Sequence, residues 1–91
     1  MRMAQKVLRQ KREFIRKKIL EVLLNMDDKT YTHFELKKTI YDRLRGEYGI
    51  STIEMYISRF AFEGLVNRVA QNLYEINKDR VKEELKKYET D

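Results

Sequence analysis

The fold of this chain is decided by residues 31–64, which read YTHFELKKTIYDRLRGEYGISTIEMYISRFAFEG. Two helix-start signals lie in this stretch, Thr32 followed by Glu35 and Ser51 followed by Glu54, and each predicts a capping box. Apolar residues recur at helical spacing after both signals, which indicates two helices of about 12 residues. The segment GEYGI between them is a short turn with two glycines. Two capped helices joined in this way predict a helix-turn-helix unit.

Three further signals define the ends of these helices. Tyr31 with Leu36, and Ile50 with Met55, are spaced as hydrophobic staples across the two helix starts. Gly46 is placed to end the first of the two helices in a left-handed conformation.

The segments on either side complete a mainly helical domain. The run ILEVLLNM before the unit is apolar nearly all round, as in a helix at the centre of a core. After the unit, LVNRV and LYEI predict the two strands of a hairpin, and Asn77 or Asp79 is placed to cap a last helix. The predicted fold class is mainly α with a small β-hairpin (α+β), with helices at about residues 4–26, 33–45, 52–64 and 78–89 and the hairpin at about residues 65–76.

The composition limits the class of protein. The 91 residues are expected to form a single domain, with a basic N-terminal helix extension (1–18) and a C-terminal helix (78–89). The chain has no cysteine and one histidine, which excludes disulfides, thiol chemistry and the usual zinc sites. No apolar run approaches the ~20 residues that span a bilayer, and the basic N-terminus lacks the apolar stretch of a signal peptide. We expect an intracellular, cytoplasmic protein without a membrane partner.

The net charge of +5 is concentrated at one end of the chain. Residues 1–18 hold eight basic residues and one acidic residue, a charge of +7, whereas the remaining chain carries −2. A cationic segment of this kind is typical of proteins that bind nucleic acid.

The order helix, short extended segment, helix, turn, helix, hairpin resembles that of the winged helix-turn-helix family, over roughly residues 15–76. A capped helix with spaced apolar residues ending in Gly-Leu-Val is similar to the recognition helix and first wing strand of that family. The residues that carry the resemblance are Ser51, Thr52, Ile53, Ile57, Phe60, Gly64, Leu65 and Val66. The resemblance implies a winged-helix fold that binds double-stranded DNA. In size and composition the chain is similar to small transcription regulators of archaea and their viruses, which for a virus implies the host cytoplasm.

The expected wing lacks the basic tip found in family members that bind phosphate with the wing. Its tip, residues 70–72, is short and carries no charge. Family members that clamp phosphates with the wing have basic residues there, so the resemblance implies a weak wing contribution.

The outer face of the helix over residues 52–64 supplies the candidate base contacts. Arg59 can pair bidentately with guanine O6 and N7, and Met55 can cover a thymine methyl group, unless it folds back on Ile50 as the staple. Tyr56 lies between the two faces and belongs either to the core or to the phosphate contacts. The candidate DNA contacts on this helix are Thr52, Met55, Tyr56, Ser58 and Arg59.

Cations on other segments are the candidate phosphate contacts, and Glu54 and Glu63 are expected to repel phosphate. Binding by cations displaces counterions from DNA, and the basic N-terminal helix can supply most of that affinity. Lys37 and Lys38, each taken singly, can equally belong to a solvated charged face, and the alternative for the N-terminal segment is a frayed, solvated helix end. The candidates are Lys37 and Lys38 in the helix-turn-helix, Arg68 in the hairpin, and Arg9, Arg12 and Arg16 in the N-terminal helix.

Two narrow apolar seams exceed what a minimal winged domain needs, namely Leu8 with Ile15, and Val81 with Leu85 and Tyr88. They either pack on each other within one chain or bury against a second copy. We predict the second arrangement, a two-fold homodimer that places two recognition helices about 34 Å apart on DNA.

Motifs that would support catalysis are missing from the sequence. It has no glycine-rich phosphate loop, metal-ligand cluster or nucleophile motif, so we predict no enzyme activity, no cofactor, no metal and no small-molecule substrate. The first hypothesis is a sequence-specific transcription regulator that occupies promoter DNA as a homodimer. The second is a protein-docking winged-helix module, because a domain body at −2 is unusual for a DNA reader. The third is a nucleic-acid binder of low specificity that acts through its basic N-terminal helix.

Overall fold

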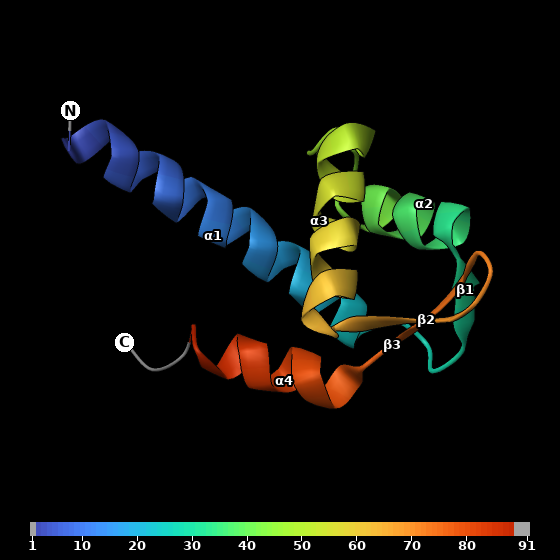
Figure 1. Ribbon diagram of the computed structural model, residues 1–91. Helices are drawn as coiled ribbons and strands as arrows, with labels where there is room; N and C mark the ends of the chain where they lie inside the picture. Colours follow the sequence, from blue (N-terminus) through green and yellow to red (C-terminus); the bar gives the residue numbers. More distant parts are fainter. Residues whose placement is uncertain (1, 89–91) are drawn as a thin grey trace.

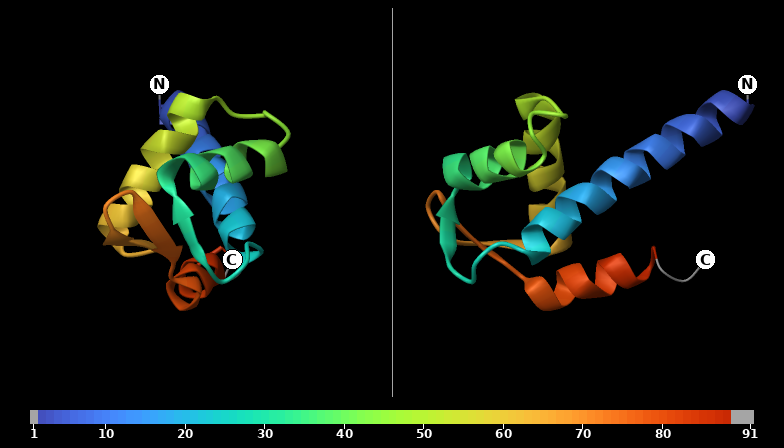
Figure 2. Two further views of the ribbon diagram at one scale, coloured as in Figure 1. Left: turned by 90° about the vertical axis from the view of Figure 1, so that its right-hand side faces the viewer. Right: turned by 180° about the vertical axis from the view of Figure 1, so that it is seen from behind.

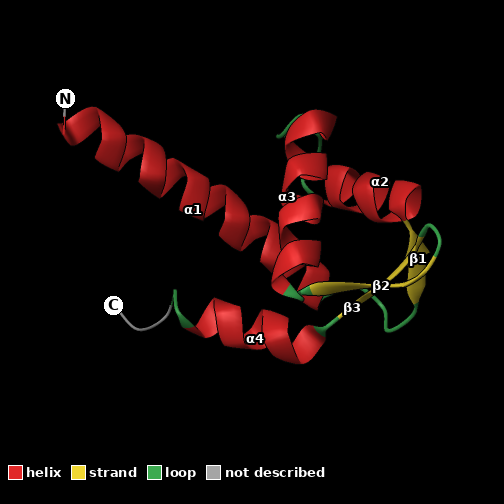
Figure 3. Cartoon of the chain, viewed as in Figure 1, coloured by secondary structure: helices red, strands yellow, loops and turns green. Residues whose placement is uncertain are grey.

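The computed structural model describes residues 2–88 of the chain, and the side chains of residues 12–88. The predicted class, mainly α with a small β-hairpin, is confirmed (Figure 1, Figure 3). The helix ends differ from the predicted ones by a few residues. In chain order the elements are α1 (Arg2–Leu24), β1 (Thr30–Thr32), α2 (His33–Arg43), α3 (Ile50–Glu63), β2 (Val66–Ala70), β3 (Leu73–Ile76) and α4 (Lys78–Lys86).

The three strands form one antiparallel sheet in the order β1-β3-β2. β2 and β3 are the predicted hairpin, and β1 adds a third strand by pairing Tyr31 with Tyr74 of β3. The hairpin turns through Gln71 and Asn72, and Asn72 takes the left-handed conformation (φ 59°) that a tight turn requires. The sheet is thus small, and its position is fixed by the short segment that leads directly into α2.

The helices are arranged around this sheet as a body with one long arm (Figure 2). α2 and α3 pack on each other beside the sheet, and α4 packs along α1. The N-terminal half of α1 extends beyond the other elements, which gives the molecule extents of 44 × 27 × 22 Å. No helix within residues 2–88 is long and apolar enough to cross a membrane.

One hydrophobic core contains side chains from all four helices and from the strands β1 and β2. The C-terminal half of α1 is its centre, as the run ILEVLLNM predicted, and Met26 remains buried although the helix ends at Leu24. Each fully buried Leu or Ile side chain contributes about 1.5–3 kcal/mol relative to an exposed one. The fully buried residues include Ile19, Leu20, Leu23, Leu36, Ile40, Ile53, Phe60, Leu65, Val66 and Val81.

The two helix starts that looked alike in sequence differ in the structure. Thr32 Oγ1 accepts from the Glu35 amide at 3.0 Å, and the Glu35 carboxylate accepts from the Thr32 amide at 3.0 Å, so the first capping box is confirmed. The second predicted box, Ser51 with Glu54, is wrong. α3 begins two residues earlier than predicted, with Gly49 as its N-cap and no side-chain cap hydrogen bond, and the Glu54 carboxylate is bound elsewhere.

The two predicted hydrophobic staples differ in the same way as the two capping boxes. Tyr31 and Leu36 are both buried, whereas Ile50 is 38% and Met55 58% exposed, so the predicted second staple does not form a buried contact. At the helix ends, Gly64 is the left-handed cap of α3 (φ 79°). Gly46 is also left-handed (φ 67°), but α2 itself ends earlier, at Arg43.

The start of α4 decides between the two caps that the sequence left open. The side chain of Asn77 accepts from the amide of Arg80 at 3.2 Å, so Asn77 is the N-cap. The next residue, Lys78, donates to the backbone oxygen of Met26 and pairs with Asp28 at 3.0 Å. A cation at the C-terminal end of α1 stabilises the exposed carbonyl groups there, and it joins the two helices at that end.

Candidate nucleic-acid interface

α3 divides into a face that enters the core and a face that is exposed. Ser58 and Arg59 are exposed, as predicted for residues that contact DNA, and Thr52 is half-buried. Two large apolar side chains lie on the same outer face, Met55 at 58% and Phe62 at 93% exposure. The outer face of α3 is therefore a strip of apolar and hydroxyl groups with one cation.

Tyr56 belongs to the core, which decides the alternative that the sequence left open and removes it from the DNA contacts. Its side chain is 5% exposed, and its hydroxyl donates to the backbone oxygen of Arg12 at 3.1 Å. Burial raises the pKa of Tyr56, although the positive charges of Arg59, Arg12 and Arg16 act in the opposite direction. Tyr56 therefore ties α3 to α1 from the inside.

Both carboxylates of α3 are neutralised by cations from other helices. Glu54 accepts from Lys37 of α2 at 3.0 Å, and Glu63 binds Arg16 of α1 through two bonds of 2.9 Å. The prediction that these two glutamates repel phosphate assumed that their carboxylates were not paired with cations. Within residues 12–88, Arg59 is the charged residue of α3 for which no ion pair is found.

Arg16 holds three helices together. Its guanidinium is bidentate to Glu63, lies 3.6 Å from Glu84 of α4 and stacks 5.1 Å from the centroid of the Phe60 ring. Burial alone would lower the pKa of Arg16, but the hydrogen bond and the charge of Glu63 outweigh burial and raise it. With 17% of its side chain exposed, Arg16 is a structural cation. These ion pairs occupy its guanidinium, so Arg16 is not among the free cations of the interface.

Glu84 responds to the same cluster. Partial burial would raise its pKa, but the hydrogen bond to Lys87, the charge of Lys87 and that of Arg16 lower it below the ordinary value. The ionised form of Glu84 is therefore part of the folded structure.

The remaining predicted cations divide into paired and free side chains. Lys37 pairs with Glu54, which occupies it within the domain. Lys38, Arg12 and Arg68 are exposed, and no ion pair of theirs is found in the described part of the chain. The side chain of Arg9 lies outside the described residues.

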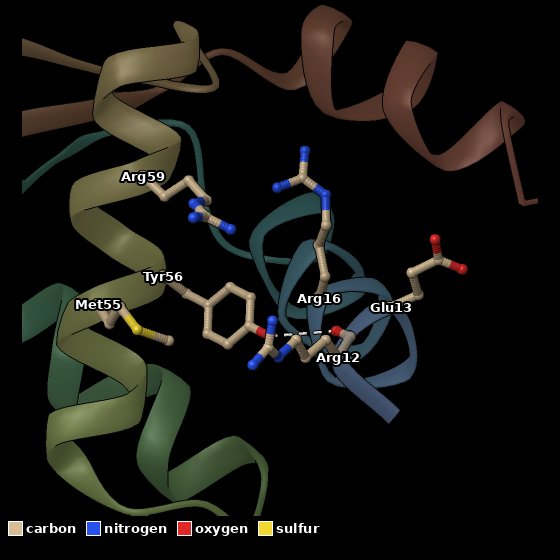
Figure 4. A pocket seen from close by; sticks show the side chains of 6 residues that line it. All are labelled: Arg12, Glu13, Arg16, Met55, Tyr56 and Arg59. Carbon is tan, nitrogen blue, oxygen red and sulfur yellow. Dashed lines mark hydrogen bonds between the residues drawn. The ribbon is translucent and has the colours of Figure 1, made fainter. Parts of the chain in front are cut away.

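A concavity lies between α1 and α3, next to the outer face of α3 (Figure 4). Its volume is about 350 Å³. Arg12 and Arg59 reach toward it from the two helices on either side of the Tyr56 ring, while Arg16 extends toward α4. No local pattern in the sequence predicts this pocket, because its walls come from segments that are 44 residues apart at Arg12 and Tyr56. The lining residues are Arg12, Glu13, Arg16, Met55, Tyr56 and Arg59.

The residues predicted to form a dimer interface pack within one chain. Val81 is fully buried, and Ile15, Leu85 and Tyr88 are partly buried against the core. α1 and α4 pack on each other, and the fully buried Val81 has no surface left for a second copy, while the homodimer itself stays a prediction. Leu8 lies outside the described side chains.

Among the described residues there is no group of three or more metal-ligating side chains. Comparison of the chain with models of protein families, with curated proteins and with solved structures found no match.

Proposed function

We propose that this protein is a winged helix-turn-helix transcription regulator that binds duplex DNA in a sequence-specific manner and inserts α3 into the major groove. One observation carries the proposal. The outer face of α3 is exposed and presents Arg59 with no carboxylate partner among the described residues, while Glu54 and Glu63 are neutralised from α2 and α1. A helix with two carboxylates becomes acceptable to phosphate when both are paired within the domain.

The arrangement of the elements supports the same proposal. α2 and α3 are joined by a short turn, and the hairpin β2–β3 follows α3 directly, with a third strand supplied from just before α2. In a helix-turn-helix the second helix reads the major groove and the first crosses the backbone. The hairpin then lies on one side of the reading helix and α1 on the other (Figure 1).

The proposed contacts follow from exposure and charge. Arg59 pairs with a guanine, and Ser58 contacts a base edge or a phosphate. Lys38, Arg68 and Arg12 contact phosphates, because each is exposed and none has an ion pair among the described residues. These contacts position the protein, and Arg59 selects the site.

The test is titration with duplex DNA from the upstream region of the protein's own gene and with a random duplex, each at two salt concentrations. We expect tighter binding to the first duplex and a loss of affinity with salt for both. The variant Arg59→Ala should lose ~1–3 kcal/mol of discrimination between the duplexes. The matched control is Lys82→Ala, an exposed cation of α4, which should leave discrimination unchanged. Equal affinity of the wild-type protein for both duplexes would refute a sequence-specific regulator.

A second function is favoured by a specific observation, the exposure of Phe62 and Met55 two helical turns apart on α3. Exposed apolar side chains on one helix face are typical of protein-binding surfaces. A docking module would show no duplex binding at low salt in the same titration. A regulator would bind duplex with Phe62→Ser close to the wild-type affinity, because that substitution removes no cation.

The third hypothesis, binding through the N-terminal cations alone, is tested on the full-length chain. Replacing the four basic residues Arg2, Lys6, Arg9 and Lys11 by glutamine removes positive charge from the N-terminal segment and leaves α3 unchanged. Under the proposed function, affinity falls but the preference for the specific duplex persists. If all binding disappears, the N-terminal helix is the binding element. Light scattering at micromolar concentration decides whether two copies act together.

A further inference from the structure

The concavity between α1 and α3 has the size of a small-ligand site and an unusual charge. Its volume of about 350 Å³ lies at the lower end of the range for ligand pockets, roughly 300–1,000 Å³. Three guanidinium groups and one carboxylate line it. Its position between two helices that Tyr56 ties together gives it a fixed floor.

Two of the three arginines are available to a ligand. Arg16 is held by Glu63 and Glu84, whereas Arg12 and Arg59 are exposed and have no ion pair among residues 12–88. They reach into the space from opposite helices (Figure 4). Two like charges aimed at one concavity repel each other, and an anion bound between them removes that repulsion.

The same arginines also act on the Tyr56 phenol at the floor of the concavity. The phenol experiences the positive charges of Arg59, Arg12 and Arg16, each of which acts to lower its pKa against the effect of burial. Arg12 and Arg59 flank the Tyr56 ring at this floor, while Arg16 extends toward α4. Glu13 opposes them, but its carboxylate is exposed and it also lines a hollow next to Glu84 of α4, on the side of α1 away from α3 (Figure 4).

The chemistry of the walls defines the ligand. A planar guanidinium matches a phosphate group through paired hydrogen bonds, and a phosphate has enough oxygens for two such groups. The Tyr56 ring and the Met55 thioether form an apolar wall beside them, and methionine adapts readily to aromatic groups. A ligand with both a phosphate and an apolar part fits this combination.

We propose that the concavity between α1 and α3 binds a small phosphate ester, with Arg12 and Arg59 on its phosphate and with Tyr56 and Met55 against its apolar part. This site has a consequence that rests on the proposed function. Arg59 is also the residue proposed to select the DNA site, so the ester and the duplex compete for it. A phosphate of the DNA backbone is the other source of the same chemistry, and the experiment separates the two.

The test follows the methyl groups of methionine by NMR in the full-length protein during titration with phenyl phosphate. Met55 lines the concavity and Met26 is 2% exposed in the core, so they serve as reporter and internal control. We expect a saturable shift of the Met55 signal with the Met26 signal unchanged. Phenol, which lacks the phosphate, should produce no saturable shift at the same concentrations.

Substitutions at the exposed arginines then test the assignment. Arg12→Gln and Arg59→Gln should each weaken phenyl phosphate binding roughly tenfold, the usual effect of losing a hydrogen bond between charged groups. Lys82→Gln on α4, outside the concavity, should leave it unchanged. Glu13→Gln should strengthen binding about twofold, because it removes a screened negative charge at the rim. An unchanged Met26 signal shows that each variant is folded.

The outcomes distinguish this proposal from the proposed function. A Met55 shift with phenyl phosphate and no duplex binding supports the site and overturns the DNA-binding proposal. Duplex binding without a Met55 shift from phenyl phosphate overturns the site. If the duplex shifts Met55 and phenyl phosphate does not, the concavity holds a backbone phosphate and the small-ester proposal is wrong. Equal binding by Arg12→Gln and wild type would also overturn it.

Discussion

Removal of the Arg16 side chain is the sharpest test of how this domain is held together. In Arg16→Ala, the α3 end loses its bidentate partner at Glu63, the α4 helix loses a charge 3.6 Å from Glu84, and the Phe60 ring loses a stacked cation. The Glu63 carboxylate then loses the one cation found to pair with it among the described residues, and Glu84 keeps its closer partner Lys87 alone. We expect a large loss of stability with the secondary structure retained.

The magnitude follows from the exposure of the three charged side chains, which are 17%, 31% and 16% exposed for Arg16, Glu63 and Glu84. Breaking a fully buried pair costs about 3–5 kcal/mol, whereas exposed pairs contribute roughly 0.2–1 kcal/mol. These groups lie between the two limits, so about 2–3 kcal/mol is expected, including the stacking on Phe60. For a domain of this length each kcal/mol shifts Tm by about 4–8 °C. The Tm of Arg16→Ala should therefore fall by roughly 10–20 °C.

The assay is chemical and thermal unfolding monitored by circular dichroism, with Arg12→Ala as the matched control. Arg12 lies one turn away on the same helix, is exposed and has no ion pair among the described residues, so both substitutions change helix propensity equally. The control should stay within about 0.5 kcal/mol of wild type. Arg16→Lys keeps the charge but loses the paired geometry, and it should recover part of the loss. If Arg16→Ala is as stable as Arg12→Ala, the clamp contributes nothing and Arg16 returns to the candidate DNA contacts.

Four further substitutions test the helix ends and the response to acid. Gly64→Ala should destabilise the fold by about 1 kcal/mol because φ is +79°, although no atom lies within 4 Å of an added Cβ. Gly49→Ser should stabilise the fold by roughly 0.5 kcal/mol because serine supplies the missing cap acceptor of α3. Denaturant midpoints that shift in the same direction for both variants would contradict these assignments. Thr32→Ala should cost about 1 kcal/mol in the same assay through loss of the capping box, and a Thr32→Ser control should retain most of the stability. The pKa of Glu84 is lowered below 4.5 in the folded chain, so its ionised form stabilises the fold above that pH, and this contribution is lost as the pH falls through the folded-state pKa. Glu84→Gln should therefore flatten the acid side of the plot of stability against pH. Parallel plots for the variant and the wild type would exclude this linkage.

The local part of the fold could be predicted from sequence because its causes are local. The capping box at Thr32, the left-handed residue at Gly46 and the hairpin each depend on residues within a few positions of one another. The box expected at Ser51 failed for a reason that no local pattern contains. Glu54 is bound by Lys37, 17 residues earlier, so it does not turn back to the start of α3.

The candidate site was predictable in its exposed residues and not in its ion pairs. Spacing alone placed Ser58 and Arg59 on the outer face of α3, and both are there. Spacing could not tell a free cation from a paired one, because Arg16 and its partner Glu63 are 47 residues apart. The same limit hid the concavity, whose two walls meet only after α1 and α3 have packed. The apolar seam at Val81 was ambiguous for a related reason, since a seam has the same sequence whether it packs on its own chain or on another.

The ion pairs also change the electrostatic description that the sequence suggested, a cationic arm on a body of charge −2. Lys18 pairs with Glu47 at 3.2 Å and Arg16 with Glu63, so part of the negative charge of the body faces α1 and is neutralised there. Cations that are already paired release few counterions when DNA binds, whereas unpaired ones release nearly one each. The salt dependence of binding should therefore reflect the free cations, such as Arg12 and Arg59, and not the total basic charge of residues 1–18. The outer face of α3 should therefore attract DNA more than the charge of the body implies, because Glu54 and Glu63 are paired with cations of α2 and α1.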